Sequence, residues 1–288
     1  MRAARTVVAA LVVAASAVVA TLVVYRVDGA EASSIADKDR LVIGVKSDQP
    51  GLGLRTRNGT FEGFDVDVAT YVAGRLGVRG KNIEFRATPS NVRENALQAG
   101  VVDLVFATYS ITPERKELVT FAGPYYVAHQ DILIREQDDS IRNVRDLRGK
   151  RLCQAAGSNS WRRVTEEREV AAALEPRGSY SECVTDLAAN RIDAVSTDDL
   201  ILAGFAAVLK REAARRREAT PVKLVNAPFT NEKYGVGLRK GDRKGCEAVN
   251  RILTEMYQDG TAETLLTEWF RPVNLDVTTT VPQFEGCA

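Results

Sequence analysis

The sequence predicts an α/β protein made of two similar lobes, and three observations support this prediction. First, 288 residues are too many for one typical core, yet too few for three ordinary domains with linkers. Second, the segment 97–105 resembles the segment 187–195, which lies 90 residues later. Third, each copy follows its own short apolar run, 41–45 or 151–155, typical of a buried strand. Two lobes explain this repetition better than one large sheet.

The first lobe is predicted to begin with a strand, a loop and a helix. Leu41–Val45 is the strand, and residues 48–59 form a turn-rich loop. Apolar residues then recur every three or four positions from Asp65 to Leu76, which indicates an amphipathic helix. Asp65 and Asp67 fall in its first turn, where they complement the helix dipole, and we expect a structural role for both.

Each copy of the internal repeat is predicted to be a helix end, a residue in the left-handed conformation and a strand. The left-handed residue is Gly100 in the first copy and Asn190 in the second. Both are residue types that accept this conformation at a helix end. The repeat therefore predicts the same local structure in both lobes.

Residues that follow the predicted strands are candidates for a shared cleft, because ligands of α/β sheets lie beyond the carboxyl ends of the strands. Lys46 follows the first strand of lobe one, and residues 157–160 follow the first strand of lobe two. The register of the repeat aligns Thr108 with Asp198. Four separated segments are therefore expected to converge on one place.

The chain is predicted to cross between the lobes twice, at 126–134 and at 223–233. A strand at 234–238 and helices at 245–257 and 261–270 then complete lobe one. The second crossing means that lobe one is built from two separate parts of the chain.

These elements divide the chain into an N-terminal segment, two lobes and a tail. The expected boundaries are 1–39 for a signal peptide or membrane anchor, 40–128 and 231–272 for lobe one, 129–230 for lobe two, and 273–288 for the tail. The tail is polar and Thr-rich, and we expect it to be loose except where Cys287 holds it.

The N-terminal segment has the charge and hydropathy of an export signal. Arg2 and Arg5 precede an uncharged run of 19 residues, Val7 to Tyr25. This length exceeds a usual signal-peptide core and approaches a bilayer span, which favours a retained membrane anchor on the extracellular face. Ala30-Glu31-Ala32 resembles a cleavage site, so cleavage and secretion are the alternative. The segment contains no cysteine, so attachment of a lipid through an N-terminal cysteine is not expected.

Composition excludes several classes of function. Lys and Arg number 39 against 38 Asp and Glu, so no nucleic-acid partner is expected. The basic run 210–217 includes Glu212 and is typical of a solvated helix face. The single histidine, His129, excludes a His-cluster metal site and most His-based triads. We expect no cofactor.

Four cysteines lie beyond the export segment, and none has the C-x-x-C spacing of zinc or redox sites. Four cysteines can pair in three ways. We predict Cys153 with Cys183 and Cys246 with Cys287, because each pair then stays within one lobe. The first bond would close a loop of 30 residues, worth about 3–4 kcal/mol in the chain-entropy model.

Several motifs, in this order along the chain, resemble the family 3 extracellular solute-binding proteins of ABC importers, and most closely the glutamate/aspartate branch. They are Ile43–Lys46 (IGVK), Gly63–Asp67 (GFDVD), Thr108–Arg115 (TYSITPER), Phe121–Tyr126 (FAGPYY) and Asp193–Asp199 (DAVSTDD). The resemblance covers roughly residues 40–271. It implies a two-lobed, periplasmic-binding-protein-like fold of type II, the Venus-flytrap fold, with two crossover strands.

The resemblance also implies which groups hold the backbone of an amino-acid ligand. Arg115 would grip the α-carboxylate, since a planar guanidinium offers two parallel donors. Thr108 and Ser110 would supply further donors near a helix start. Asp198 would accept the ammonium group, while Asp199 faces away and begins the next helix as a cap. The alternative for Arg115 is a surface position.

Residues from the second lobe and from the side-chain pocket complete the expected site. Ser158 and Ser160 are neutral donors, unless their Gly-Ser segment is a plain turn. Lys46 and Arg93 match the cations that the acidic-amino-acid branch carries, and a ligand carboxylate would offset their mutual repulsion. Glutamate or aspartate therefore outranks glutamine. The alternative for Arg93 is an exposed helix start that pairs with Glu94 or Glu62.

Three classes of function follow. The first is a monomeric binding subunit that captures an amino acid by lobe closure and passes it to an ABC permease in the membrane, without chemistry. The second is a dehydratase-type enzyme on the same fold, which the lone histidine and paired cations support poorly. The third is an extracellular sensor that acts through a membrane partner.

Overall fold

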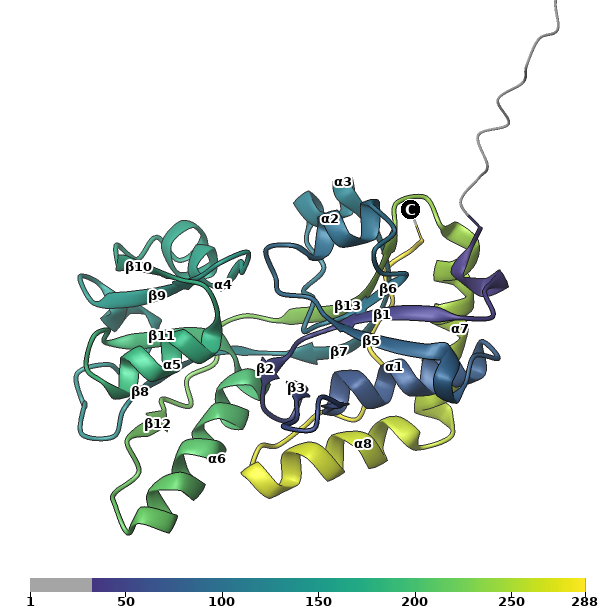
Figure 1. Cartoon of the computed structure of the whole chain (residues 1–288). Helices are drawn as coiled ribbons and strands as arrows, with labels where there is room; N and C mark the ends of the chain where they lie inside the picture. The colour runs from purple at the N-terminus through teal and green to yellow at the C-terminus, as the bar shows by residue number, and fades with distance from the viewer. Residues whose placement is uncertain (1–32, 288) are drawn as a thin grey trace, which may run out of the picture. The chain divides into compact units, whose positions relative to one another are not determined.

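A computed structural model of the protein describes residues 33–287. The predicted export run, Val7 to Tyr25, lies outside the described residues, as do the rest of the first 32 residues. Within the described part, two five-stranded sheets each carry their own helices (Figure 1). No helix in residues 33–287 is long and apolar enough to cross a membrane.

The sheet of lobe one combines strands from both ends of the described chain. Its order is β5 (Ile83–Ala87), β1 (Leu41–Val45), β6 (Leu104–Phe106), β13 (Glu232–Arg239) and β7 (Val119–Ala128). β1 runs parallel to β5 and β6, whereas β13 runs antiparallel to β6 and β7. A small sheet of β2 (Asp48–Gln49), β3 (Gly53–Arg55) and β4 (Phe61–Glu62) lies in the loop after β1.

The sheet of lobe two repeats this pattern. Its order is β10 (Ala173–Arg177), β9 (Arg151–Ala155), β11 (Ala194–Asp198), β8 (Gln130–Arg135) and β12 (Val222–Leu224). β9 runs parallel to β10 and β11, and β8 runs antiparallel to β11 and β12. The chain passes from one sheet to the other between β7 and β8 and returns between β12 and β13, so the two-lobed α/β fold with two crossovers is confirmed.

Helices cover both sheets. They are α1 (Phe64–Arg75), α2 (Arg93–Gln98), α3 (Pro113–Leu118), α4 (Ser160–Arg162), α5 (Tyr180–Ala188), α6 (Asp199–Arg216), α7 (Arg243–Gln258) and α8 (Thr261–Phe270). Single turns stand at η1 (Ile35–Asp37), η2 (Gly80–Asn82), η3 (Val144–Leu147), η4 (Arg163–Glu167) and η5 (Arg271–Val273). In lobe one α1, α7 and α8 pack together, with Phe64 edge-on to Phe270 at 5.7 Å.

The internal repeat is present in the structure. Gly100 and Asn190 have φ of 66° and 57°, each just after the helix of its copy. Three residues later, the carboxylates of Asp103 and Asp193 each accept a hydrogen bond from a backbone amide at the start of the neighbouring strand, at 2.8 and 2.9 Å. The repeated aspartate therefore fixes strand position in both lobes.

The basic run 210–217 lies on the last two turns of α6 and just beyond, and apart from Ala213 its residues are exposed. It is a solvated helix face, as expected. Both predicted disulfides, Cys153–Cys183 and Cys246–Cys287, are present.

The tail differs from its prediction. Besides Cys287, four apolar residues of the predicted tail, Val273, Leu275, Val277 and Phe284, pack against the hydrophobic core. The Glu285 amide also donates to the Gly123 carbonyl at 2.9 Å. The expectation of a loose segment was wrong, because a few apolar side chains spaced along a Thr-rich stretch suffice to hold it on the surface.

Candidate ligand-binding site

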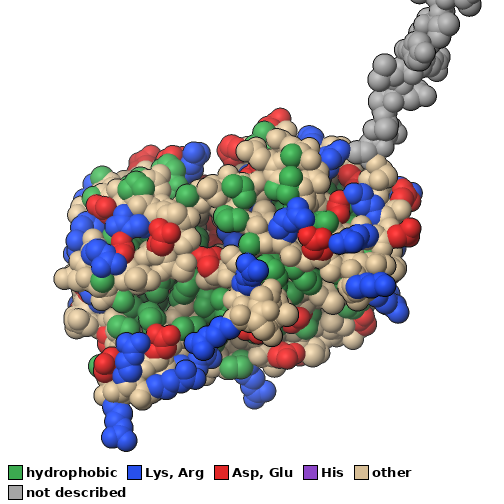
Figure 2. Space-filling view, in the orientation of Figure 1, with side chains coloured by type: hydrophobic (Ala, Val, Ile, Leu, Met, Phe, Trp, Pro, Cys, Tyr) green, Lys and Arg blue, Asp and Glu red, His purple; other side chains and the backbone are tan. Residues whose placement is uncertain are grey.

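The two lobes face each other across a cleft, seen as a groove in the space-filling view (Figure 2). A cavity of about 690 Å³ is lined by residues 112–115 of lobe one and 154–159 of lobe two, among others. The two lobes also touch directly, where Gly157 of lobe two lies against Asn91 of lobe one. Gly157 has φ of 72°, and a side chain there would come within 2.4 Å of the Asn91 nitrogen. Glycine is therefore required where the lobes touch.

Three cations from lobe one lie together at this contact. Lys46 follows β1, Arg93 begins α2 and Arg115 lies in α3; all three are buried. The Lys46 ammonium donates to the Ser90 hydroxyl. Burial, followed by the charge of Arg93, lowers the pKa of Lys46 to about 7. The predicted convergence of these residues is present, and the surface alternatives for Arg93 and Arg115 are wrong.

Tyr109 and Glu94 hold the two guanidinium groups. The Tyr109 ring lies 3.8 Å from the Arg93 guanidinium carbon and 5.3 Å from that of Arg115. Glu94 Oε1 accepts from the Tyr109 hydroxyl at 2.8 Å and lies 3.4 Å from Arg93 Nε and 3.7 Å from Arg115 Nε. Glu94 was considered only as a surface partner of Arg93, and here it joins both arginines.

Thr108 and Ser110 follow β6 and are both buried. Thr108 adopts φ of 45°, and its amide donates to the Asp65 carboxylate at 2.9 Å. Asp65 also accepts from the Tyr125 hydroxyl at 2.7 Å, which agrees with a structural role. Burial raises the pKa of Asp65 to about 6. These contacts fix the turn that presents Thr108 and Ser110.

Arg115 links the two lobes directly. Its Nη1 donates to the Ser110 carbonyl at 2.7 Å, and its Nη2 donates to the Gly157 carbonyl of lobe two at 3.3 Å. Thr112 caps α3 by accepting from the Arg115 amide at 3.3 Å. Burial, followed by the charge of Arg93, lowers the pKa of Arg115 to about 10. The guanidinium is thus held at the meeting point of both lobes.

Ser158 and Ser160 begin the α4 region of lobe two. The Ser160 amide donates to the Ser158 hydroxyl at 3.1 Å, and the Ser160 hydroxyl lies 3.1 Å from that of Thr197. Tyr180 hydrogen-bonds both serines, at 2.6 and 2.9 Å. These serines form a hydrogen-bonded group, and Ser158 lines the cavity between the lobes.

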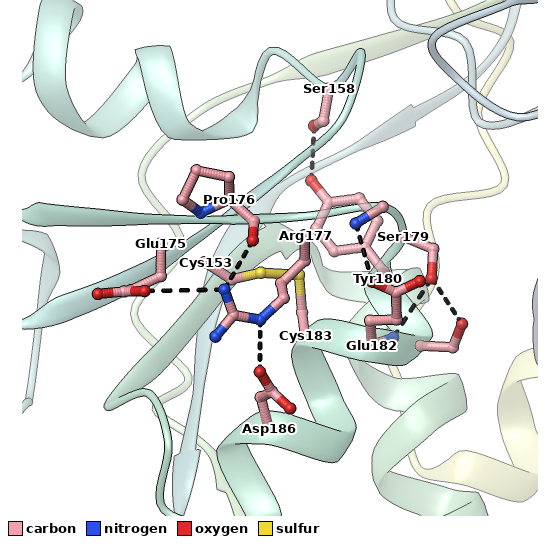
Figure 3. Close-up of a disulfide and its surroundings, with 12 residues drawn as sticks. Cys153, Ser158, Glu175, Pro176, Arg177, Ser179, Tyr180, Glu182, Cys183 and Asp186 are labelled. Atoms are coloured by element: carbon pink, nitrogen blue, oxygen red, sulfur yellow. Dashed lines mark hydrogen bonds and ion pairs between the residues drawn. A yellow bond between two sulfur atoms is a disulfide. The ribbon is translucent and has the colours of Figure 1, made fainter.

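A disulfide bond joins the two elements that carry this group of side chains. Cys153 lies in β9, which leads into the Ser158 segment, and Cys183 lies in α5, the helix that begins with Tyr180. Figure 3 shows the Tyr180 hydroxyl directed at Ser158 next to the Cys153–Cys183 bond. The disulfide therefore fixes the strand and the helix that position these side chains.

Asp198 ends β11 and occupies the cap position of α6, where it is buried. Its Oδ2 accepts from the Tyr234 hydroxyl at 2.6 Å. Burial, followed by the charge of Glu232, raises the pKa of Asp198 well above its usual range. Asp199 begins the helix, and its carboxylate accepts from the His129 amide at 3.3 Å. The prediction that Asp199 is the cap was wrong, because Asp198 occupies that position.

The arrangement separates charge across the cleft. Lys46, Arg93 and Arg115 place buried positive charge on lobe one, and Asp198 places a carboxyl on lobe two. Such a pattern is complementary to a small molecule that carries both carboxylate and ammonium groups. Among residues 33–287, no group of three or more His, Cys, Asp or Glu side chains is placed to hold a metal ion.

Residues 41–272 match the sequence family described as bacterial extracellular solute-binding proteins, family 3. The chain belongs to this family. The resemblance drawn from the five motifs is therefore confirmed, and this family 3 protein is similar to named binding proteins along most of its length.

Two relatives and one solved structure illustrate the similarity. The glutamate-binding protein GluB of Corynebacterium efficiens is 41% identical over 237 residues, 81% of this chain and 79% of that protein. The glutamine-binding protein GlnH of an ABC transporter of Bacillus subtilis is 32% identical over 241 residues, 83% of this chain and 84% of that protein. An ancestral arginine-binding protein bound to glutamine is 34% identical, with a TM-score of 0.71, over 81% of this chain and 98% of that one.

Three tyrosines of this family 3 protein were missed as site residues. They are Tyr109 beneath the arginines, Tyr180 beside the serines and Tyr234 on Asp198. Tyr109 lies inside a motif that was recognised, so its position carried a signal. Tyr180 begins α5, and Tyr234 lies in β13. Nothing in the sequence around either residue distinguishes it from an ordinary core tyrosine.

Proposed function

We propose that this protein captures an acidic amino acid, glutamate or aspartate, in the cleft and delivers it as a monomer to an ABC permease in the membrane. The single observation that carries the proposal is the cluster of three buried cations, Lys46, Arg93 and Arg115, opposite the buried carboxyl of Asp198. Two carboxylates on a ligand would be attracted to these cations, and its ammonium group would be attracted to Asp198.

Arg115 is proposed to hold the α-carboxylate, and Asp198 the ammonium group. Arg115 lies at the contact between lobes and is fixed by Ser110 and Gly157, so lobe closure would surround the group that it holds. The Ser110 and Thr108 region and the serines of lobe two would add neutral donors. Charge-assisted hydrogen bonds of this kind are about twice as strong as neutral ones.

Lys46 and Arg93 are proposed to hold the side-chain carboxylate. Both cations are buried at the same contact, where like charges repel each other, and the charge of Arg93 contributes to the lowered pKa of Lys46. A ligand carboxylate would remove that repulsion, whereas a neutral amide would not. The names of the relatives, glutamate-binding in one case and glutamine-binding in another, support an amino acid of this size.

The proposal includes no chemistry on the ligand. Incubating the protein with glutamate and analysing the solution by NMR should show the amino acid unchanged after release. Formation of a product at a rate that depends on Asp198 would instead indicate an enzyme.

A thermal-shift panel of the twenty amino acids tests the binding role. A ligand at 100 times its dissociation constant stabilises the folded protein by about 2.7 kcal/mol, which gives a clear shift of Tm. Glutamate and aspartate should give the largest shifts. If none of the twenty shifts Tm, the amino-acid-binding role is wrong.

A further inference from the structure

The chain after η5 forms a C-terminal strap, residues 274–287, which begins beside α6 and β12 of lobe two and ends on lobe one. In Figure 1 it is the yellow trace that runs from the end of α8 back toward the C-terminal mark. Val277, in its first half, packs against the hydrophobic core. The strap ends in the Cys246–Cys287 disulfide, which bonds it to α7. The strap is therefore attached in its first half and at its end.

Glu285 is the point where the strap meets the elements that carry the site. Its amide donates to the Gly123 carbonyl of β7 at 2.9 Å. Its carboxylate pairs with Lys116 through one oxygen and with Lys233 through the other, the latter at 3.0 Å. One side chain thus joins α3 to β13, two elements that are far apart in the sequence.

The two lysines are direct neighbours of site residues. Lys116 follows Arg115 in α3, and Lys233 precedes Tyr234, whose hydroxyl bonds Asp198. The Ile111 amide also donates to the Lys233 carbonyl at 2.8 Å, so the turn before α3 rests on β13. Glu285 therefore bridges the backbone segments that carry the groups proposed for the α-carboxylate and the ammonium.

A short helix such as α3 needs contacts from outside itself. It has six residues, and an isolated helix of that length is not stable in water. If α3 moves in the unbound protein, ligand binding must order it, and affinity falls by the cost of that ordering. The strap supplies an anchor for α3 at Lys116, which is not among the residues that line the cavity.

We infer that the C-terminal strap presets the position of α3 against β13, with Glu285 as a positioning residue that acts through Lys116 and Lys233. The Cys246–Cys287 bond, two residues from Glu285, keeps the carboxylate in place. This inference rests on the proposed function for its effect on affinity, but its effect on α3 does not depend on any ligand. The strap is thus a part of the binding apparatus that lies outside the cleft.

The ion pairs themselves are too exposed to matter much for global stability. The side chains of Lys116, Lys233 and Glu285 are 41%, 43% and 23% exposed. Exposed pairs contribute little to folding. A change at Glu285 should therefore leave Tm nearly unchanged while it alters α3 and ligand affinity, and this difference separates positioning from a merely structural role.

Glu285→Gln in the full chain tests the inference with two measurements. Amide hydrogen exchange at residues 114–118, without ligand, should become faster than in wild type. The Kd for glutamate should rise by about two- to fivefold. Glu247→Gln, which breaks an exposed pair with Arg243 in α7, is the matched control and should change neither value.

The double variant Cys246→Ala/Cys287→Ala should also show faster exchange at α3 and a higher Kd for glutamate. When Lys116→Met is combined with Glu285→Gln, the change in each value should be less than the sum of the changes in the two single variants. Wild-type exchange at α3 in both Glu285→Gln and the double cysteine variant would overturn the inference. If wild type binds no glutamate, the proposed function fails, whereas the exchange measurement still decides whether the strap positions α3.

Discussion

The hydroxyl of Tyr234 donates a 2.6 Å hydrogen bond to the carboxylate of Asp198, and the two residues come from different lobes. Asp198 ends β11 of lobe two, and Tyr234 lies in β13, the strand by which the chain returns to lobe one. The proposed ammonium acceptor is therefore oriented by the crossover region. A change in the angle between the lobes would act directly on this bond.

Removing this hydroxyl should weaken binding of every amino-acid ligand to a similar extent. Tyr234→Phe leaves the buried Asp198 without its donor, and we expect affinity to fall about tenfold, equivalent to roughly 1.4 kcal/mol. Calorimetry with glutamate and glutamine measures the effect. Tyr257→Phe removes a hydroxyl that bonds the Tyr125 carbonyl on β7 and should leave affinity unchanged. Equal effects of both variants would contradict the role of Tyr234.

Arg115→Ala and Asp198→Ala should each weaken binding of all amino-acid ligands, because they contact the groups that all amino acids share. Removing one member of a buried, hydrogen-bonded charge pair costs about 2–5 kcal/mol, a factor of roughly 30 to several thousand in Kd. Isothermal titration calorimetry measures this loss. Binding within about threefold of wild type would show that the residue is wrongly assigned.

Arg93→Gln should change specificity more than general affinity. It removes a charge-assisted contact with the side-chain carboxylate and leaves the α-carboxylate and ammonium contacts in place. The preference for glutamate over glutamine should narrow by about tenfold or more. Lys46→Met should act in the same direction, more weakly because the flexible ammonium acts as a point charge.

The control for this specificity change is Arg86→Gln, since Arg86 lies in the same lobe but its side chain is 43% exposed. It should leave the ratio of the two Kd values unchanged. Equal losses for glutamate and glutamine in both Arg93→Gln and Lys46→Met would contradict the acidic-substrate proposal.

Binding of an acidic ligand should depend on pH through Lys46. Its pKa of about 7 is set first by burial and then by Arg93. A ligand carboxylate would raise that pKa, so above pH 7 binding must take up a proton. Affinity for glutamate should therefore fall from about pH 7 to about pH 9, by at most about tenfold per pH unit. Calorimetry in buffers of different ionisation enthalpy measures the proton uptake.

Asp198 acts in the opposite direction. Burial and Glu232 raise its pKa, a ligand ammonium lowers it again, and binding at Asp198 releases a proton. Lys46→Met removes the contribution of the lysine to this pH dependence. Its affinity for glutamate should therefore not fall above pH 7. The same pH profile in wild type and Lys46→Met would show that Lys46 does not meet the ligand carboxylate.

Much of the fold could be predicted because local patterns agree with tertiary structure. The repeat placed Gly100 and Asn190 at helix ends, and the predicted helix 261–270 has the same bounds as α8. Helix α1 begins one residue earlier than expected and ends one residue earlier. Shifts of one residue arise because helix ends fray, and tertiary contacts that the sequence pattern does not contain decide where the last turn stops.

Three contacts between distant segments could not be predicted. Tyr234 and Asp198 are 36 residues apart and in different lobes, so no local pattern pairs them. The approach of Gly157 to Asn91 is likewise visible only when both lobes are placed. The strap was missed because its apolar residues are few, and their burial depends on a surface that the rest of the chain provides.

The most direct test of the central claim is a set of calorimetric titrations of wild-type protein with glutamate, aspartate, glutamine and asparagine at pH 7. At least one acidic amino acid should bind with one site per chain and about tenfold or more tighter than its amide, because only the acid offers a carboxylate to Lys46 and Arg93. Binding of an amide as tight as that of its acid, or no binding of any of the four, would contradict the account.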